Sequence, residues 1–415
     1  MSENSCLLVG LDLPTLTQWS AQSSLDELGE LASTAGLQVE HKILQRRQAP
    51  HYRHYVGEGK LEEIKTLIQQ DEIEVLIADD ELSPGQQKTL EETLKIKVLD
   101  RSGLILDIFS QRAHTAEAQL QVELAQLEYM MPRLTRLWTH LSRLGSGVGA
   151  RGPGETQLET DKRQIRKRMQ LLKERLEKVQ SQRELRRKDR CEIPVLSGAI
   201  VGYTNAGKST LMNHLSKAEL LSEDKLFATL DPTSRKSTIP HYKHLVLTDT
   251  VGFIQKLPHH LINAFYATLE EVSKANFLIH VIDASHPNLE GTLHTSNEII
   301  KNLKSDGLPR LYLFNKMDQV SKPNQLKEQL KAYQPSLFVS AFQDDLHAQL
   351  SQAFDGLLGS LEKEFVFRIP YTRMEVLNYI HENGRIISKT FSDYIDVSCV
   401  MNPSLGERVH RSLAI

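Results

Sequence analysis

A strand–loop–helix pattern near the middle of the chain restricts the possible fold more than any other feature. Residues 195–201 form an apolar run, Gly-Tyr-Thr-Asn-Ala-Gly-Lys-Ser occupies 202–209, and a helical run follows over 210–215. This order matches the G-x-x-x-x-G-K-[ST] phosphate loop in the context that gives the pattern its meaning. The glycines let backbone amides surround phosphates, Lys208 can reach the β- and γ-phosphates, and the Ser209 hydroxyl can bind Mg²⁺. The alternative interpretation is a chance glycine-rich turn.

Two later motifs argue against chance. An apolar strand at 245–249 ends in Asp-Thr-Val-Gly at 249–252, where Asp249 can hold Mg²⁺ through water and the Gly252 amide can face a γ-phosphate. A second strand, 311–314, ends in Asn-Lys-Met-Asp at 315–318. The Asp318 carboxylate can accept two hydrogen bonds from guanine that adenine cannot donate, so the site should select GTP over ATP.

Other residues complete the expected site. Lys316 would lie along the base and ribose, Asn315 would brace the phosphate loop, and the segment at Ser340 would place a backbone amide near the guanine O6. All these elements follow strands, and open α/β sheets bind ligands at the carboxyl ends of their strands. The predicted GTP-binding residues are Gly202, Tyr203, Thr204, Asn205, Ala206, Gly207, Lys208, Ser209, Thr210, Phe227, Ala228, Thr229, Leu230, Asp231, Asp249, Thr250, Val251, Gly252, Asn315, Lys316, Met317, Asp318, Ser340 and Ala341.

Three positions bear on hydrolysis and on metals. The segment 227–233 should supply a threonine oxygen to Mg²⁺; we assign Thr229, with Thr233 as the rival. The predicted Mg²⁺ ligands are therefore Ser209, Thr229 and, through water, Asp249. Phe253 stands where small Ras-like enzymes have a water-orienting glutamine, so unaided hydrolysis should be slow. Asn205 could help to hold K⁺ beside the phosphates, or could simply favour a tight turn.

Composition excludes several classes of protein. The first 14 residues have no basic region followed by a long apolar run, and no stretch approaches the ~18 apolar residues of a membrane span. Three scattered cysteines predict neither a disulfide framework nor a zinc site, and a cytoplasmic location fits best. The net charge of −3 conceals a basic segment, 131–190, with 17 basic and 7 acidic residues. This segment indicates either a polyanion contact or a solvated helical surface.

The rest of the chain divides by pattern. Short strands alternate with helices over 1–112, which predicts an α/β subdomain with a parallel sheet. Two apolar-striped helical stretches over 113–190 flank a Gly-rich segment, 145–154, and predict a long antiparallel hairpin with an exposed tip. The nucleotide-binding α/β pattern covers 193–361, and 365–415 reads as a small α+β domain.

The chain resembles the HflX family of translational GTPases, within the group that also contains Obg, over nearly its whole length. The resemblance rests on segments beyond the nucleotide motifs, above all Arg-Gly-Pro-Gly-Glu-Thr-Gln at 151–157. The others are His-Tyr-Val-Gly-Glu-Gly-Lys at 54–60, Asp-Glu-Leu-Ser-Pro-Gly-Gln at 80–86, the segment 100–109 and Phe-Ala-Thr-Leu-Asp-Pro-Thr at 227–233. It implies a Ras-like P-loop GTPase domain between the N-terminal subdomain with its hairpin and the small C-terminal domain.

The resemblance also implies binding to the large ribosomal subunit and the separation of stalled or idle ribosomes into subunits in the GTP state. The protein would act as a monomer, with the hairpin tip near the peptidyl-transferase centre and the basic segment on ribosomal RNA. Two alternatives remain open: a signalling or scaffold GTPase that binds a protein through the hairpin, and a GTPase module for RNA modification. The residues expected to bind the ribosome are Gly149, Arg151, Gly152, Arg163, Arg166, Lys167 and Arg168.

Overall fold

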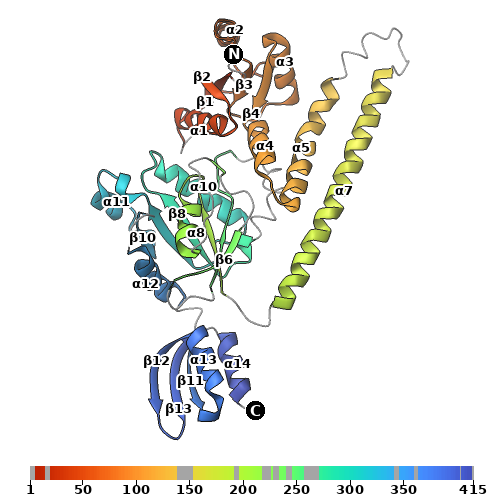
Figure 1. Ribbon diagram of the computed structural model, residues 1–415. Coiled ribbons are helices and arrows are strands. Elements are labelled where there is room, and N and C mark those ends of the chain that lie inside the picture. The colour runs from red at the N-terminus through yellow and green to blue at the C-terminus, as the bar shows by residue number, and fades with distance from the viewer. Residues whose placement is uncertain are drawn as a thin grey trace. The chain divides into compact units, whose positions relative to one another are not determined.

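The protein is described here by a computed structural model (Figure 1). The described residues are 5–14, 19–137, 153–190, 196–216, 226–227, 233–239, 245–256, 271–340, 345–358, 363–401 and 403–413. The chain forms two compact units. The first comprises residues 1–181 with the segments 224–231 and 254–267, and the second comprises 182–223, 232–253 and 268–415.

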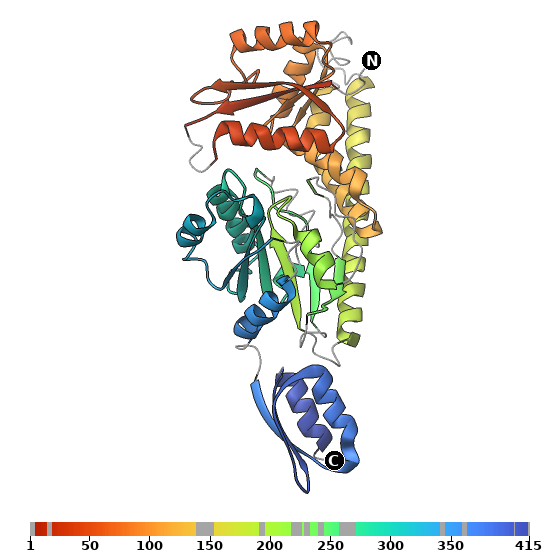
Figure 2. The same cartoon turned by 60° about the vertical axis from the view of Figure 1, so that its left-hand side comes forward.

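The N-terminal layer is a four-stranded parallel sheet in the order β2-β1-β3-β4. Its strands are β1 (Ser5–Asp12), β2 (Gln38–Arg46), β3 (Val75–Ala78) and β4 (Lys97–Asp100). Helices α1 (Ala21–Thr34), α2 (Glu58–Gln70), α3 (Pro84–Leu94) and α4 (Arg101–Arg112) alternate with them, and Figure 2 shows α1 and the α2–α3 pair on opposite faces of the sheet. The alternation predicted from the sequence is confirmed in this layer.

Local chemistry explains where α3 begins. The Ser83 hydroxyl accepts a hydrogen bond from the backbone amide of Gln86, and the Gln86 side-chain oxygen accepts one from the backbone amide of Ser83. Pro84 occupies the first helical position. This reciprocal capping box satisfies two donors that a helix start otherwise leaves unpaired. Serine at the capping position followed by proline is a helix-start signal that can be read from the sequence alone.

The predicted hairpin contains two long helices, α5 (Ala116–Leu137) and α7 (Pro153–Arg190), which run side by side in both views (Figures 1 and 2). The expected seam of α7 is present, since Leu172 is buried and its seam neighbours are less exposed than the residues between them. The apolar pattern of α5 predicts a seam that includes Leu120, Leu124, Leu127 and Met131. The structure adds a second buried stripe, which consists of Ala118, Val122, Ala125 and Tyr129. This stripe packs on α3 and α4. Helix α5 therefore has two buried faces, of which the sequence pattern revealed only one.

The second parallel sheet has six strands in the order β10-β9-β8-β5-β7-β6, with β6 antiparallel to β7. These strands are β5 (Ser197–Gly202), β6 (Thr233–Lys236), β7 (Val246–Asp249), β8 (Phe277–Asp283), β9 (Arg310–Asn315) and β10 (Ser336–Phe338). Helices α8 (Lys208–Ser216) and α12 (Leu346–Leu358) contribute to one core against the sheet. Helices α10 (Leu289–Asn302) and α11 (Pro323–Gln329) contribute to another, so the sheet is covered by helices from two sets.

The C-terminal residues form a separate three-stranded antiparallel sheet in the order β11-β13-β12. It contains β11 (Lys363–Ile369), β12 (Gly384–Phe391) and β13 (Ile395–Met401), with α13 (Met374–Asn383) and α14 (Pro403–Leu413) packed on it. Strand β13 alternates strictly between buried and half-exposed residues, which is the signature of a sheet covered on one face. The α+β character expected for this segment is thus confirmed.

Among the helices within the described ranges, none is both long enough and apolar enough to span a membrane. The predicted domain boundaries stay predictions, because the two units do not test each of them.

Candidate functional site

The predicted phosphate loop connects β5 to α8 and has an unusual backbone. Asn205 and Gly207 have φ angles of +59° and +93°, in the left-handed region that favours glycine. A Cβ on Gly207 would lie 2.3 Å from the Asn315 Nδ2 atom, so no side chain fits there. The loop conformation therefore explains why its sequence requires glycine at 207.

Lys208 is the first residue of α8, and only 7% of it is exposed. Its ammonium group donates a 2.7 Å hydrogen bond to the Tyr203 carbonyl, within the loop itself. Burial lowers the pKa of Lys208 to about 8, although the negative charge of Asp249 opposes this shift. A buried ammonium at the start of a helix is well suited to bind a polyphosphate, which would restore its charged form.

Ser209 and Asp249 meet at the carboxyl edge of the sheet. The Ser209 hydroxyl donates a 2.8 Å hydrogen bond to an Asp249 carboxylate oxygen, and Asp249 is fully buried. The neighbouring Thr250 hydroxyl donates to the Ile200 carbonyl at 2.7 Å, which fixes the end of β7 against β5. Hydroxyl and carboxylate oxygens suit Mg²⁺, which takes few protein ligands and completes its shell with phosphates and water. The described residues contain no group of three or more His, Cys, Asp or Glu side chains arranged for a metal.

The Asn-Lys-Met-Asp motif lies where β9 ends. Asn315 is buried, and its side-chain amide donates to the Ala206 carbonyl at 2.9 Å, so it braces the phosphate loop as predicted. Lys316 has a left-handed backbone (φ +60°) and pairs with Asp283 at 2.7 Å. Asp318 is exposed in the short 3-10 helix Met317–Gln319, with its carboxylate accessible to a ligand.

Asp283 was missed by the sequence analysis, although a signal existed. It is the last residue of β8, and acidic residues that end parallel strands reach the ligand-binding edge of the sheet. Its pairing with Lys316 holds the lysine stem beside the base motif, so Asp283 is a positioning residue in this site.

The segment after Asp249 closes over the phosphate loop. The Phe253 amide donates to the Gly202 carbonyl at 3.0 Å, and the Thr204 amide donates to the Phe253 carbonyl at 2.8 Å. Phe253 is 3% exposed, so its ring is part of the core and does not face solvent. A buried phenyl ring cannot orient a water molecule, which agrees with the role expected from the sequence.

Part of the predicted site lies outside the described residues. These positions are Ala228, Thr229, Leu230, Asp231 and Ala341. The choice between Thr229 and Thr233 therefore stays open. Thr233 is described: it begins β6 directly opposite Asp249, and its hydroxyl is buried with no hydrogen-bond partner among the described atoms. Thr210, Val251, Met317 and Ser340 lie in or next to the elements already named.

The basic residues of the predicted hairpin differ in their exposure and in their pairing with acidic side chains. Arg163, Arg166 and Lys167 are exposed on α7, whereas Arg168 makes two hydrogen bonds to Glu123 of α5, at 2.7 and 2.9 Å. This pairing partly neutralises Arg168, a contact that the one-dimensional charge count could not reveal. Gly149, Arg151 and Gly152 lie outside the described residues. Helix α7 begins at Pro153, two residues inside the segment predicted as loop, because proline fits the first turn of a helix.

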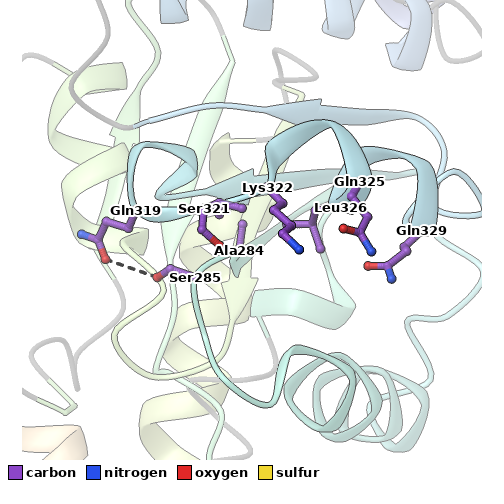
Figure 3. Close-up of a pocket in the computed structure, with 9 residues that line it drawn as sticks. Ala284, Ser285, Gln319, Ser321, Lys322, Gln325, Leu326 and Gln329 are labelled. Carbon is purple, nitrogen blue, oxygen red and sulfur yellow. Dashed lines mark hydrogen bonds between the residues drawn. The ribbon is translucent and has the colours of Figure 1, made fainter.

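A polar groove of about 460 Å³ lies directly after the base motif (Figure 3). Figure 3 shows Gln319 reaching Ser285, with which it shares a 3.3 Å hydrogen bond. Its other lining side chains are mainly amides and hydroxyls, with Lys322 as a cation and no carboxylate. The groove can therefore offer hydrogen bonds but no general acid or base chemistry of the carboxylate type.

Comparisons with known proteins cover almost the whole chain. Residues 22–110 match a family described as GTP-binding GTPase N-terminal, 112–190 match GTP-binding GTPase Middle Region, and 197–316 match 50S ribosome-binding GTPase. GTPase HflX of Caldanaerobacter subterraneus subsp. tengcongensis is 42% identical over 400 residues, which is 94% of this chain and 90% of that protein. GTPase HflX of Escherichia coli (strain K12) is 43% identical over 350 residues, covering 81% and 82% of the two chains.

A similar solved structure is the complex of SsGBP with GDP, with a TM-score of 0.50 and 27% identity, which covers 86% of this chain and 99% of that chain. The buried lysine, the Ser209–Asp249 pair and the Asn315 brace thus stand in a chain whose relatives are GTPases along nearly their full length. The chain belongs to the HflX family of GTPases.

Proposed function

We propose that the carboxyl edge of the second sheet binds GTP and hydrolyses it with the help of Mg²⁺. The observation that carries the proposal is the convergence of Lys208, the Ser209–Asp249 pair and the Asn315 brace on one loop. Loop amides and the N-terminus of α8 would surround the β-phosphate, and Lys208 would bridge the β- and γ-phosphates. Mg²⁺, held by Ser209 and by Asp249 through water, would neutralise charge on the phosphate oxygens.

We propose that hydrolysis is slow until a partner supplies what Phe253 cannot. The buried phenyl ring leaves no side chain at that position to align the attacking water. Single-turnover rates should therefore rise when ribosomal particles are added, and equally fast rates without them would contradict the proposal. Asn205, already in a left-handed conformation, would add a K⁺ ligand beside the phosphates. If so, rates should be higher in K⁺ than in Na⁺ salts, and equal rates would remove that role.

Guanine selectivity is assigned to Asp318. We expect Asp318→Asn to weaken GTP binding about 100-fold, because an amide cannot accept both guanine donors. The same variant should gain affinity for xanthosine triphosphate, whose C2 carbonyl can accept a hydrogen bond from the new amide. Competition binding with GTP, ATP and xanthosine triphosphate measures both effects. An unchanged preference for GTP would refute the assignment.

We propose further that the protein, in its GTP state, binds the large ribosomal subunit and separates stalled or idle ribosomes into subunits. The match of residues 197–316 to a family described as 50S ribosome-binding GTPase supports the partner. The exposed Arg163, Arg166 and Lys167 of α7 supply cations for ribosomal RNA. The proposal implies a cytoplasmic protein that acts as a monomer.

Sedimentation with ribosomal subunits, in the presence of a GTP analogue or GDP, tests the partner. Light scattering of intact ribosomes tests the separation. Replacing the predicted tip, 145–154, by a short Gly-Ser linker should leave nucleotide binding intact and abolish separation. Normal separation by this variant would instead make the hairpin a spacer. Replacing the three exposed basic residues by Gln should flatten the salt dependence of binding, by about one log unit per lost phosphate contact.

A further inference from the structure

The N-terminal sheet has its own point of strand reversal. From β1 the chain moves outward to β2, and β3 then lies on the other side of β1, so the connections diverge between β1 and β3. Open α/β sheets bind ligands in the crevice at this point, beyond the carboxyl ends of the strands. Asp79 and Asp80 directly follow β3 at that edge, and Asp79 is 2% exposed. Two adjacent carboxylates at such a place, one of them buried, repel each other unless a positive charge lies close to them.

The surrounding side chains satisfy these acids only in part. The Ser24 hydroxyl donates to Asp79 at 2.7 Å, and the Tyr55 hydroxyl donates to Asp80 at 2.6 Å. The buried Arg101 guanidinium lies 3.7 Å from Asp79 but only 2.7 Å from Glu27. The closer charge partner of Arg101 is thus Glu27, and Asp79 needs a second cation.

Lys256 supplies that cation. Its ammonium group contacts the Asp79 carboxylate and lies 2.6 Å from an Asp80 oxygen. Burial tends to raise the pKa of Asp79, but the positive charges of Arg101 and Lys256 outweigh burial and hold this pKa below its usual value. Lys256 also has a φ angle of +53°, in the left-handed region that is uncommon for residues other than glycine. The crevice of the N-terminal sheet is therefore filled by a side chain from elsewhere in the same chain.

A second segment docks on the same unit. Phe227, also left-handed at φ +56° and 3% exposed, packs edge-to-face on Phe109 of α4 with ring centroids 4.7 Å apart. The described parts of these two segments, residues 226–227 and 254–256, belong to the same unit as the N-terminal sheet. These are the segments that follow the phosphate loop and the Asp249–Gly252 motif, and nucleotide switches use such segments to sense a γ-phosphate.

Gly252 shows why this docking affects nucleotide choice. A Cβ built on Gly252 would lie 2.8 Å from the Thr204 Cγ2 atom and 3.0 Å from the Lys208 Nζ atom. The backbone at 252 thus packs directly on the lysine assigned to the γ-phosphate, and a third phosphate bound by this lysine would compete with this backbone for space. Lys256 is only four residues further along, a span of at most about 14 Å of extended chain. The intervening Phe253, Ile254 and Gln255 are all buried, so a shift at Gly252 would be carried through a short packed stretch of chain to the Lys256 contacts.

We propose that the Asp79–Asp80 pair is a receptor for Lys256 and that their contact selects against the γ-phosphate, which favours GDP over GTP. This inference rests on the proposed nucleotide site. By linkage, a partner that displaces Lys256 from Asp79 and Asp80 would raise the affinity for GTP relative to GDP by the factor through which the contact lowers it. The Asp79–Asp80 pair would thus sense the third phosphate through one lysine.

The test compares affinities for GDP and for a non-hydrolysable GTP analogue, measured with fluorescent derivatives on the full-length chain. Lys256→Ala and, independently, Asp80→Asn should raise the ratio of GTP-analogue affinity to GDP affinity by about fivefold or more. Lys256→Arg keeps the charge and should stay near the wild-type ratio. Lys304→Ala is the matched control, because Lys304 is an exposed lysine with the same left-handed backbone (φ +55°) far along the chain from this contact.

The possible outcomes separate the inference from the proposed function. A ratio that Lys256→Ala leaves unchanged or lowers, in a protein that binds both nucleotides, would overturn the coupling alone. A wild-type protein that binds neither nucleotide would overturn the nucleotide site and the coupling with it. A rise of equal size in Lys304→Ala would also overturn the coupling, since loss of any left-handed lysine would then suffice. Circular dichroism of each variant confirms that the ratio is measured on folded protein.

Discussion

The two parallel sheets of this protein share an architecture and differ in the charge at the point where their strand order reverses. In the second sheet the reversal lies at β5, which leads into a glycine-rich loop with a buried lysine. In the N-terminal sheet it lies between β1 and β3, where Asp79 and Asp80 hold Lys256. The same crevice thus suits a polyanionic ligand in one sheet and a cationic side chain in the other. The backbone provides the place, and the residues just after the strand decide the sign of the charge that binds there.

The largest expected effect is the loss of GTP binding when the cation of the second sheet is removed. Lys208→Ala should weaken GTP binding by about 100-fold or more, because it removes a buried cation that no neighbour replaces at the phosphates. Isothermal titration with GTP measures the loss, and Lys304→Ala controls for the removal of one positive charge. Binding within a few-fold of wild type would show that the loop amides and Mg²⁺ suffice without the lysine.

The acidic crevice should respond through stability. Asp79→Asn leaves Arg101, which is 1% exposed, with one carboxylate fewer, and we expect the free energy of unfolding to fall by about 3 kcal/mol. Ser24→Ala removes only a hydrogen bond to Asp79 and should cost about 1 kcal/mol. Urea unfolding followed by the fluorescence of Trp19, in a Trp138→Phe background, reports on the N-terminal unit. Equal losses in the two variants would mean that the charge on Asp79 contributes nothing beyond its hydrogen bonds.

Local signals predicted most of both sheets, and long-range contacts account for what they missed. The strand–helix alternation, the capping box at Ser83 and the glycine requirement of the phosphate loop depend on residues a few positions apart. The pairing of Lys256 with Asp79 joins residues 177 positions apart, and no periodicity encodes it. The Arg168–Glu123 pair and the second face of α5 likewise depend on which helix lies alongside. Sequence patterns therefore located the nucleotide site but not the contacts that surround it.

The strands themselves also differ between the sheets. The interior of β1 is apolar, whereas β8 carries a fully buried histidine, His280, whose two ring nitrogens have no hydrogen-bond partner within the described structure. Burial and the positive charges of Arg310 and Lys208 lower the pKa of His280 to about 3. We expect His280→Leu to stabilise the protein by about 1–2 kcal/mol at pH 7, because it removes a polar ring that buries unpaired nitrogens.

The same substitution should change the pH dependence of stability. His280 takes up a proton in the unfolded chain below about pH 6.5 but stays neutral in the folded protein down to about pH 3. The wild type should therefore lose stability as the pH falls through this window, by at most about 1.4 kcal/mol per pH unit from this group. The gain from His280→Leu should consequently grow between pH 7 and pH 5. A gain that does not vary with pH would show that folding does not lower the pKa of His280.

The smallest expected effect concerns the charge of the anion-binding crevice itself. The pKa of Lys208 is about 8 because the ammonium group is buried, so an increasing fraction of the free protein loses this charge above pH 8. A bound polyphosphate favours the charged form and raises the pKa, so binding above pH 8 must take up a proton. GTP affinity should accordingly fall by about three- to tenfold between pH 8 and pH 9 and stay nearly constant between pH 7 and pH 7.5.

Lys208→Arg is the matched control, because a guanidinium stays charged throughout this range. The same variant also separates the titration of the lysine from the titration of the guanine base. If the arginine variant loses affinity as steeply as the wild type, the fall does not come from Lys208. The phosphate-binding crevice would then keep its positive charge at every pH tested, as the acidic crevice of the N-terminal sheet keeps its negative charge.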